Sequence, residues 1–320
     1  MTATSVQRET LRLGTRASRL ALTQSQHVAD ALTAASGVPV ELVHVSTYGD
    51  RSQAAISQLG GTGVFVTALR EALVAGEVDL AVHSFKDLPT APAPGLTIGA
   101  VPPREDPRDV LVARDGLTLG GLAPGARVGT GAPRRMAQLR ALGLGLDVVP
   151  IRGNVDTRMA RVTGHGDGSG DLDAVVLARA GLSRLGRLHA ATEVLDPIQV
   201  LPAPAQGALA VECRSDDTRV RELLALLDDP AARACVAAER AVLTALEAGC
   251  SAPVAAYAEL AEGEGGAAEL YLRASVTALD GSDAVRGSAS GPATGAVELG
   301  HALAAELLDR GAASLMAASR

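Results

Sequence analysis

The sequence has few aromatic residues and few cysteines. Its 320 residues contain no Trp, 3 Tyr and 2 Phe, so hydrophobic cores must be built from Ala, Leu and Val. Three widely spaced cysteines, an odd number, do not form a disulfide framework, and a reducing cytoplasm is the expected location. No signal peptide is visible, and no run approaches the roughly eighteen apolar residues of a membrane span.

Basic charge and cofactor motifs are also scarce. The net charge is −7, whereas general nucleic-acid binders carry a basic excess, so we expect no nucleic-acid partner. No CxxC or Cys/His cluster predicts a metal site. Neither GxGxxG nor GxxxxGK[ST] is complete, which disfavours a nucleotide cofactor and enzymes that act on phosphorylated substrates.

Lysine is nearly absent. Of the 29 basic residues one is lysine, Lys86, and the other 28 are arginine. Lys86 is therefore either a chance survivor or a position where a compact ammonium does what a planar guanidinium cannot. It stands in "AVHSFKDLP" directly before Asp87. Asp87 either pairs with Lys86 at the surface, for well under about 1 kcal/mol, or stabilises a cation that develops on a substrate.

The hydrophobic pattern predicts an α/β fold with mainly parallel sheets. Up to about residue 215, short β-type runs alternate with helical patterns, beginning with "LRLGT" and a helix from Ser18 to about Ala35. A long helical region from Thr218 to Glu247 is interrupted near "DDPAA". The last seventy or so residues read as two strands and an amphipathic helix from Val297 to about Leu308.

The Pro-rich stretches divide the chain into three expected domains. "PPREDPRD" and "DPIQVLPAPAQG" look like two crossings between a pair of α/β domains, which would form a hinge over a ligand cleft. We expect domain 1 at residues 8–102 with 200–217, domain 2 at 103–199, and a smaller α/β domain 3 at 218–320. No apolar seam indicates more than a monomer.

Several arginines fall at turns between a strand and a helix. Such turns line the ligand crevice of doubly wound sheets, and helix N-termini there offer free N–H groups to anions. A single arginine of this kind is usually a solvated surface charge. Four such turns together favour a cleft for a ligand with several carboxylates, gripped by paired hydrogen bonds. The residues at these turns are Arg16, Ser18, Thr130, Gly131, Arg134, Arg135, Arg152, Arg158 and Arg184.

One cysteine differs from the other two. Cys213 in "ALAVEC" and Cys235 in "RACVAAER" read as buried core thiols. Cys250 in "LEAGCSAPVAA" has small neighbours on both sides, so it is filler in a crowded turn, a nucleophile, or an attachment point.

Eight segments, in order and over nearly the whole chain, are similar to signature segments of the porphobilinogen deaminase (hydroxymethylbilane synthase) family of tetrapyrrole biosynthesis. Any one segment is weak, but eight in register are very specific. They are "GTRASRLAL", "VHSFKDLP", "REDPRDVLV", "VGTGAPRR", "IRGNVDTR", "AGLSRLG", "LPAPAQGALAVECR" and "EAGCSAPVAAYAEL".

The resemblance implies a fold, a reaction and a cofactor. It implies two lobes like those of type II periplasmic binding proteins around a cleft, plus a smaller C-terminal α/β domain. Four porphobilinogen molecules would be added head to tail to a dipyrromethane held by Cys250 through a thioether, with hydroxymethylbilane and ammonia released. Asp87 would be the catalytic aspartate, assisted by Lys86.

The remaining positions would divide between the cofactor and the substrate. Those that would contact the cofactor, besides Cys250, are Ser18, Lys86, Asp87, Thr130, Gly131, Ala132, Arg134 and Arg135. Those that would bind substrate carboxylates are Arg16, Arg152, Arg158 and Arg184.

The sequence departs from the family at two places. Gln58 and Thr62 stand where the family often carries lysines, and Gly131-Ala132 replaces two hydroxyl residues. A non-enzymatic solute-binding module of the same two-lobed architecture is the main alternative. The missing export signal, the third domain and Cys250 disfavour it.

Overall fold

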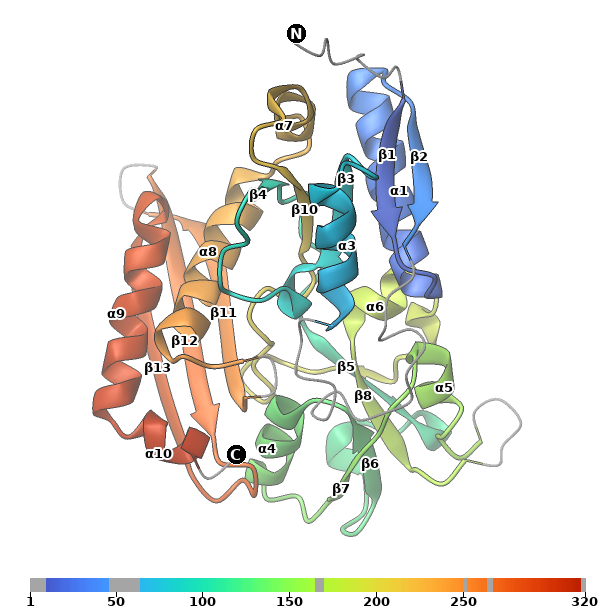
Figure 1. Ribbon diagram of the computed structural model, residues 1–320. Helices are drawn as coiled ribbons and strands as arrows, with labels where there is room; N and C mark the ends of the chain where they lie inside the picture. The colour runs from blue at the N-terminus through green and yellow to red at the C-terminus, as the bar shows by residue number, and fades with distance from the viewer. Residues whose placement is uncertain (1–9, 46–63, 165–169, 250–251, 264–266, 318–320) are drawn as a thin grey trace, which may run out of the picture. The chain divides into compact units, whose positions relative to one another are not determined.

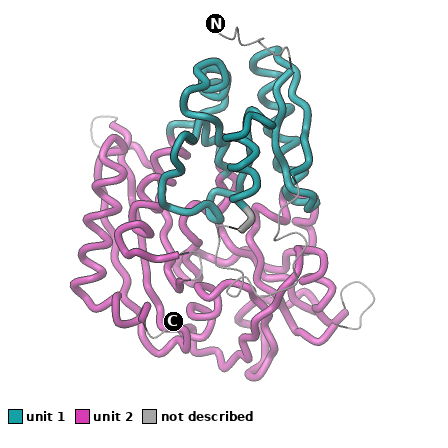
Figure 2. The backbone as a smooth tube through the Cα atoms, in the orientation of Figure 1, with its two compact units in different colours: residues 1–103, 209–230 teal, residues 104–208, 231–320 magenta. Residues whose placement is uncertain are grey.

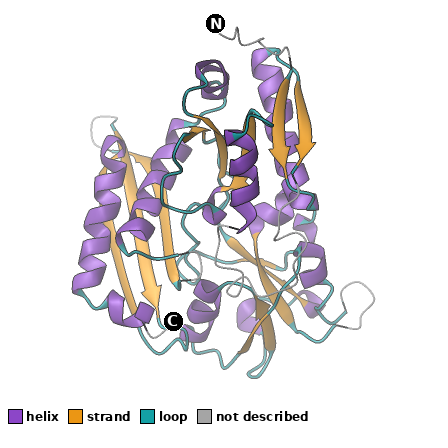
Figure 3. Cartoon of the chain, in the orientation of Figure 1, coloured by secondary structure: helices purple, strands orange, loops and turns teal. Residues whose placement is uncertain are grey.

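The chain forms two compact units (Figure 2). The computed structural model describes residues 10–45, 64–164, 170–249, 252–263 and 267–317. Unit 1 comprises residues 1–103 and 209–230, and unit 2 comprises residues 104–208 and 231–320. The described residues form three sheets with helices packed on them, so the predicted α/β class is confirmed (Figure 1, Figure 3). The expectation of mainly parallel sheets is wrong, because both five-stranded sheets contain antiparallel pairs and the third sheet is entirely antiparallel.

Unit 1 contains a five-stranded sheet of order β2-β1-β3-β10-β4. Strands β2, β1 and β3 are parallel, whereas β10 runs antiparallel to both β3 and β4. Because β3 is buried along most of its length, both faces of the sheet must be covered. The strands are β1 (Leu11–Thr15), β2 (Val40–His44), β3 (Leu80–Ser84), β4 (Leu96–Ala100) and β10 (Leu209–Arg214).

Helices cover the two faces of this sheet. Helix α1 (Arg19–Ser36) starts where predicted, because the Ser18 hydroxyl accepts a hydrogen bond from the Ala21 N–H. Helices α1 and α7 (Thr218–Ala225) share one core with the sheet. Helix α3 (Val64–Val74) packs on the other face through a second core.

The first sheet of unit 2 repeats this order as β7-β6-β8-β5-β9. Strands β7, β6 and β8 are parallel, and β5 runs antiparallel to β8 and β9. Its strands are β5 (Asp109–Ala113), β6 (Arg127–Thr130), β7 (Asp147–Pro150), β8 (Ala174–Ala178) and β9 (Glu193–Val194). Its helices are α4 (Pro133–Ala141), α5 (Val155–Met159) and α6 (Arg179–Arg184).

The third sheet is an antiparallel meander at the C-terminal end of unit 2. It consists of β11 (Val254–Glu262), β12 (Ala268–Thr277) and β13 (Ala284–Pro292). Helices α8 (Pro230–Ala245), α9 (Ala296–Asp309) and α10 (Ala312–Ala317) share its core. A Cβ on Gly300 would clash with the Ala238 carbonyl oxygen, so α8 and α9 are in direct backbone contact. Short 3-10 turns include η1 (Phe85–Asp87), η2 (Arg114–Gly116), η3 (Leu119–Gly121), η4 (Leu188–Ala190) and η6 (Ala293–Gly295).

One expected domain boundary differs from the packing. Helix α7, assigned from the sequence to domain 3, places Val220 and Leu224 in the core of the unit 1 sheet. Pro230 then starts α8, because proline is tolerated in the first helical turn but not further in. The third sheet's core therefore begins with α8 rather than at residue 218. Among the described residues, no helix is long and apolar enough to cross a membrane.

Candidate functional site

In unit 1, the predicted polar residues gather at one edge of the sheet. Strands β1 and β3 are adjacent and parallel, so Thr15 and Ser84 end at the same edge. The turns that follow carry Arg16 and Ser18 after β1, and Lys86 with Asp87 after β3. The carboxyl edge of a doubly wound sheet is where such folds bind ligands.

Buried neighbours hold the Lys86-Asp87 turn in place. Phe85 and Leu88 are 8% and 2% exposed, and the Leu88 N–H donates to the Phe85 carbonyl. Between these anchors Lys86 is half-buried and Asp87 is exposed. The 3-10 turn η1 therefore presents both charged side chains at the strand end, with the backbone fixed on either side.

A buried ionic cluster lies within the same sheet. Glu212 on β10 is 2% exposed and accepts hydrogen bonds from Arg70 of α3, while the His83 Nε2 lies 3.2 Å from its Oε2. Burial alone would raise the pKa of Glu212, but hydrogen bonds and charges from His83 and Arg70 hold it below its ordinary value. Sequence reasoning missed Glu212. A single carboxylate within the apolar run "ALAVEC" was the available signal.

In unit 2, the arginine pair at the start of α4 is buried. Arg134 and Arg135 are each 4% exposed, and both donate to Asp109, which is fully buried on β5. The distances are 2.7 Å from Arg134 Nη2 to Asp109 Oδ2 and 2.7 Å from Arg135 Nη2 to Asp109 Oδ1. Arg134 also donates to the Leu201 carbonyl at 2.6 Å. The Gln206 amide nitrogen donates to Asp109 Oδ1 at 2.7 Å.

This cluster carries one more positive than negative charge. Burial would raise the pKa of Asp109, but the two guanidinium groups hold it far below its ordinary value, so the carboxylate is ionised. Burial lowers the pKa of Arg134, and Asp109 offsets this only in part. The buried Nε atoms of Arg134 and Arg135 have no hydrogen-bond partner among the described residues. An uncompensated buried cation is costly, so the donor set favours an additional anion.

The turn before α4 leaves its first N–H groups without a side-chain cap. Strand β6 ends at the buried Thr130, whose hydroxyl accepts a hydrogen bond from the Ala132 N–H at 3.4 Å. Ala132 is the N-cap residue and has no side-chain acceptor to offer. A Cβ on Gly131 would lie 2.8 Å from the Ile151 carbonyl oxygen and 3.3 Å from Arg158 Nη2, so this turn packs closely against the Arg158 side chain.

The other arginines of unit 2 lie near the same sheet edge. Strands β6, β7 and β8 are parallel, so the turns with Arg152 after β7 and Arg184 in α6 after β8 lie on the side of Thr130. Arg152 is exposed and Arg184 is half-buried. Arg184 donates to the Gly207 carbonyl at 2.6 Å, and burial lowers its pKa against the opposing charge of Glu105.

Two expectations fall outside what the structure tests. Cys250, Gln58 and Thr62 lie outside the described residues. In the described part of the chain, no group of three or more His, Cys, Asp or Glu side chains could hold a metal ion.

Within each unit, the structure places the predicted arginines and the Lys86-Asp87 turn near one edge of the sheet. Sequence reasoning missed Asp109 and Gln206, the polar partners of the arginine pair.

Comparison with known proteins gives a consistent result. A family model described as "Porphobilinogen deaminase, dipyromethane cofactor binding domain" matches residues 11–222, and one described as "Porphobilinogen deaminase, C-terminal domain" matches residues 233–309. A porphobilinogen deaminase of Nocardia farcinica is 61% identical over 310 residues, which cover 96% of this chain and 88% of that protein. One of Mycobacterium marinum is 60% identical, covering 96% of each.

Among solved structures, the methionine binding protein MetQ is similar at a TM-score of 0.43 and 13% identity, covering 68% of this chain and 90% of that one.

Proposed function

Because the chain belongs to the porphobilinogen deaminase family, we propose specific roles for the charged residues at the two sheet edges. The chain is a transferase of tetrapyrrole biosynthesis. It condenses four porphobilinogen molecules head to tail on a dipyrromethane cofactor and releases hydroxymethylbilane, with one ammonia lost per monomer.

The net positive charge of the buried Arg134–Asp109–Arg135 cluster is the observation that carries the cofactor assignment. Every pyrrole of the substrate and of the cofactor bears an acetate and a propionate, so a bound carboxylate would supply the missing anion. The unpartnered Nε donors and the uncapped N–H groups of α4 match that chemistry. Within unit 2, Arg134 and Arg135 bind cofactor carboxylates, with hydrogen bonds from the turn Thr130–Ala132.

The remaining arginines bind the substrate and the growing chain. Arg152 is exposed and follows β7, Arg16 is half-buried and follows β1, and Arg158 is half-buried in α5. Every added ring brings two further carboxylates, so several guanidinium groups must be available as the chain lengthens. This requirement explains a concentration of arginine in a protein of net charge −7.

Asp87 is the catalytic acid–base residue. Loss of ammonia breaks the C–N bond of the porphobilinogen aminomethyl group and leaves positive charge on that pyrrole. A dipyrromethane held by Cys250, Arg134 and Arg135 would supply the nucleophilic pyrrole carbon, and the proton that this carbon loses would need an acceptor. The Asp87 carboxylate accepts hydrogen bonds from pyrrole N–H groups and stabilises the positive charge on the substrate pyrrole. It also accepts the proton that the attacking ring releases. Lys86 binds an acetate or propionate group of a neighbouring pyrrole ring and keeps that negative charge away from Asp87.

Removal of one guanidinium tests the arginine cluster. In Arg135→Gln the cluster of Arg134, Asp109 and residue 135 has no net charge. We therefore expect the fraction of purified protein that carries the two-pyrrole adduct to fall about tenfold, which is the effect of losing one hydrogen bond to a charged group. Intact-mass measurement gives this fraction, and thermal melting shows whether the variant is folded. The control is Arg114→Gln, which removes an arginine paired with Asp173 at the surface. A folded Arg135→Gln protein with full adduct contradicts the assignment.

Lys86→Arg tests whether the lysine is required. The broader guanidinium keeps the charge but changes its position, so we expect kcat/KM for porphobilinogen to fall about tenfold, the equivalent of one hydrogen bond to a charged group. Steady-state kinetics measure the effect. The control is Arg221→Lys at an exposed position on α7. If Lys86→Arg matches the wild-type kinetics, the single lysine is a chance survivor.

The cellular setting follows from the same chemistry. The enzyme acts in the cytoplasm as a monomer on a small-molecule substrate, without nucleic acid or membrane. The net charge of −7 supports the expectation of no nucleic-acid partner. Light scattering on the purified protein measures the oligomeric state.

A further inference from the structure

The chain passes between the two units at three places, and residues next to two of them bind a single buried carboxylate. The passages follow Pro103, Ala208 and Pro230. Glu239 lies on α8, the helix that starts at the third passage, and is completely buried. Its carboxylate contacts the chain next to each of the other two passages.

Four hydrogen bonds converge on Glu239. Arg104, the first residue of unit 2, donates from Nη1 to Oε1 at 2.6 Å and from Nη2 to Oε2 at 2.9 Å. The Ala205 N–H donates to Oε2 at 2.6 Å, and the Ala258 N–H of β11 donates to Oε1 at 2.8 Å. Burial alone would lower the pKa of Arg104, but the charge and hydrogen bonds of Glu239 raise it above its ordinary value. Each carboxylate oxygen of Glu239 therefore accepts two hydrogen bonds.

The backbone that meets Glu239 is held in an unusual conformation. Ala205 has φ of 61°, in the left-handed region that a residue with a Cβ rarely adopts. Gly207 has φ of 87°, and a Cβ there would clash with the Glu105 carbonyl oxygen. Such backbone strain persists only where its surroundings enforce it, and it clusters at functional sites. Here it directs the Ala205 N–H to the carboxylate.

The same contacts continue to the arginine pair. Arg104 Nε donates to the Gln206 carbonyl at 2.9 Å, and the Gln206 amide nitrogen donates to Asp109 and to the Pro107 carbonyl, each at 2.7 Å. Asp109 in turn binds Arg134 and Arg135. A continuous polar chain thus runs from α8, which leads to Cys250, to the two guanidinium groups assigned to the cofactor.

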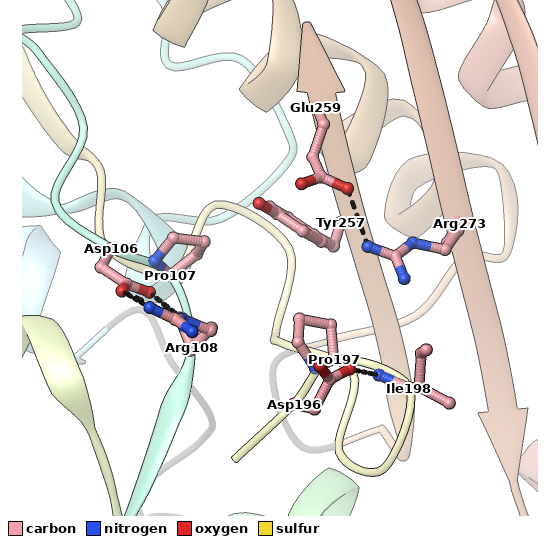
Figure 4. Close-up of a pocket in the computed structure, with 9 residues that line it drawn as sticks. All are labelled: Asp106, Pro107, Arg108, Asp196, Pro197, Ile198, Tyr257, Glu259 and Arg273. Atoms are coloured by element: carbon pink, nitrogen blue, oxygen red, sulfur yellow. Dashed lines mark hydrogen bonds and ion pairs between the residues drawn. The ribbon is translucent and has the colours of Figure 1, made fainter. Parts of the chain in front are cut away.

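Elsewhere this region is open. Unit 2 contains a cavity of about 450 Å³. It is lined by Asp106–Arg108 and Asp196–Ile198 on one side and by Tyr257, Glu259 and Arg273 of the third sheet on the other (Figure 4). The ring of Tyr257 lies 5.8 Å from the Arg104 guanidinium carbon. Beside this cavity, the Arg104–Glu239 pair joins the segments together with two further hydrogen bonds, from the Ala256 N–H to the Pro202 carbonyl and from Arg140 to the Leu279 carbonyl.

We propose that Glu239 is a positioning residue, which fixes the helix leading to Cys250 relative to the arginine pair while the chain is elongated. This inference rests on the proposed function. A carboxylate that only stabilised the fold would affect melting but not the course of elongation, because the reacting rings would still be held in the same place. Loosening a positioning contact instead displaces the tethered rings from their binding groups.

Glu239→Gln tests the proposal. The amide keeps the volume and one acceptor oxygen but removes the charge that holds Arg104. We expect a folded protein that carries the two-pyrrole adduct, with kcat lowered about tenfold to hundredfold and KM for porphobilinogen little changed. When porphobilinogen is limiting, intact-mass measurement resolves protein molecules that carry pyrrole chains of different length. We expect chains of intermediate length to make up a larger fraction in Glu239→Gln than in the wild type.

The control is Asp79→Asn in unit 1, which weakens a similar pair, since Arg12 donates to Asp79 at 3.0 Å. It should lower the melting temperature without changing the bound species. The proposal is overturned if Glu239→Gln has the kcat of the wild type and the same distribution of protein-bound chain lengths. If Glu239→Gln does not fold, Arg104→Lys, which keeps the charge, must give the same accumulation to a smaller degree. A wild-type protein without any adduct would instead reject the proposed function itself.

Discussion

Cys250→Ser is expected to yield a polypeptide of unmodified mass, whereas the wild-type protein should be heavier by two pyrrole units. A thiol is a far better nucleophile than a hydroxyl at neutral pH, so serine cannot replace it in forming the bond to the cofactor. Without the tether, turnover should be undetectable. Intact-mass measurement under denaturing conditions checks the covalent bond, because only a covalent adduct survives unfolding.

The other two cysteines provide matched controls. Cys213 and Cys235 are 0% and 7% exposed, and burial raises the pKa of the Cys213 thiol to about 11, so it is protonated at neutral pH. Cys213→Ala and Cys235→Ala should therefore keep the full adduct. An adduct on Cys250→Ser, or its loss from either control, would show that the cofactor is attached elsewhere.

The sequence was sufficient to locate the charged turns but not their partners. Strand-to-helix turns follow from local pattern alone, because a parallel strand must be followed by a helix that returns along the sheet. This rule correctly placed Arg16, Arg134 and Arg152 after strands. Burial depends on contacts between distant segments, so the approach of Gln206 and Asp109 to the arginine pair could not be read locally.

Two buried carboxylates illustrate why such partners escape a sequence reading. Asp109 stands in "REDPRDVLV", where acids and bases alternate as they would on a solvated loop. Glu239 stands beside Arg240 in an Ala-rich helix, where a charged residue is ordinarily on the solvent face. In each case the deciding fact is a guanidinium from elsewhere in the chain, supplied by Arg134 and Arg135 or by Arg104.

The helix α7 shows the same limit at the level of domains. Both α7 and α8 lie in the single helical region expected from Thr218 to Glu247, and each contains Ala, Leu and Arg. Only the packing of Val220 and Leu224 into the unit 1 core separates them. Pro230 marks the break in the sequence, but it cannot show which sheet each helix covers.

Asp87→Asn is expected to abolish nearly all turnover while the fold and the adduct are kept. Asparagine has the same size, and Asp87 is exposed between two buried anchors, so the turn should be unchanged. The lost contact between the carboxylate and a developing cation, at ~4 Å and an effective dielectric of about 20, is worth about 4 kcal/mol. That energy corresponds to a decrease of about a thousandfold in kcat.

The surface-pair alternative predicts a different result. An exposed Asp87–Lys86 pair is worth well under about 1 kcal/mol, so its removal would leave kcat within a few fold of wild type. Single-turnover kinetics on protein shown by mass to carry the adduct separate the two cases. Asp216→Asn, which changes an exposed acid in a turn of the same unit, should turn over at the wild-type rate. More than about a tenth of wild-type activity in Asp87→Asn would leave less than 1.4 kcal/mol to the carboxylate, too little for a group that stabilises the reacting cation directly.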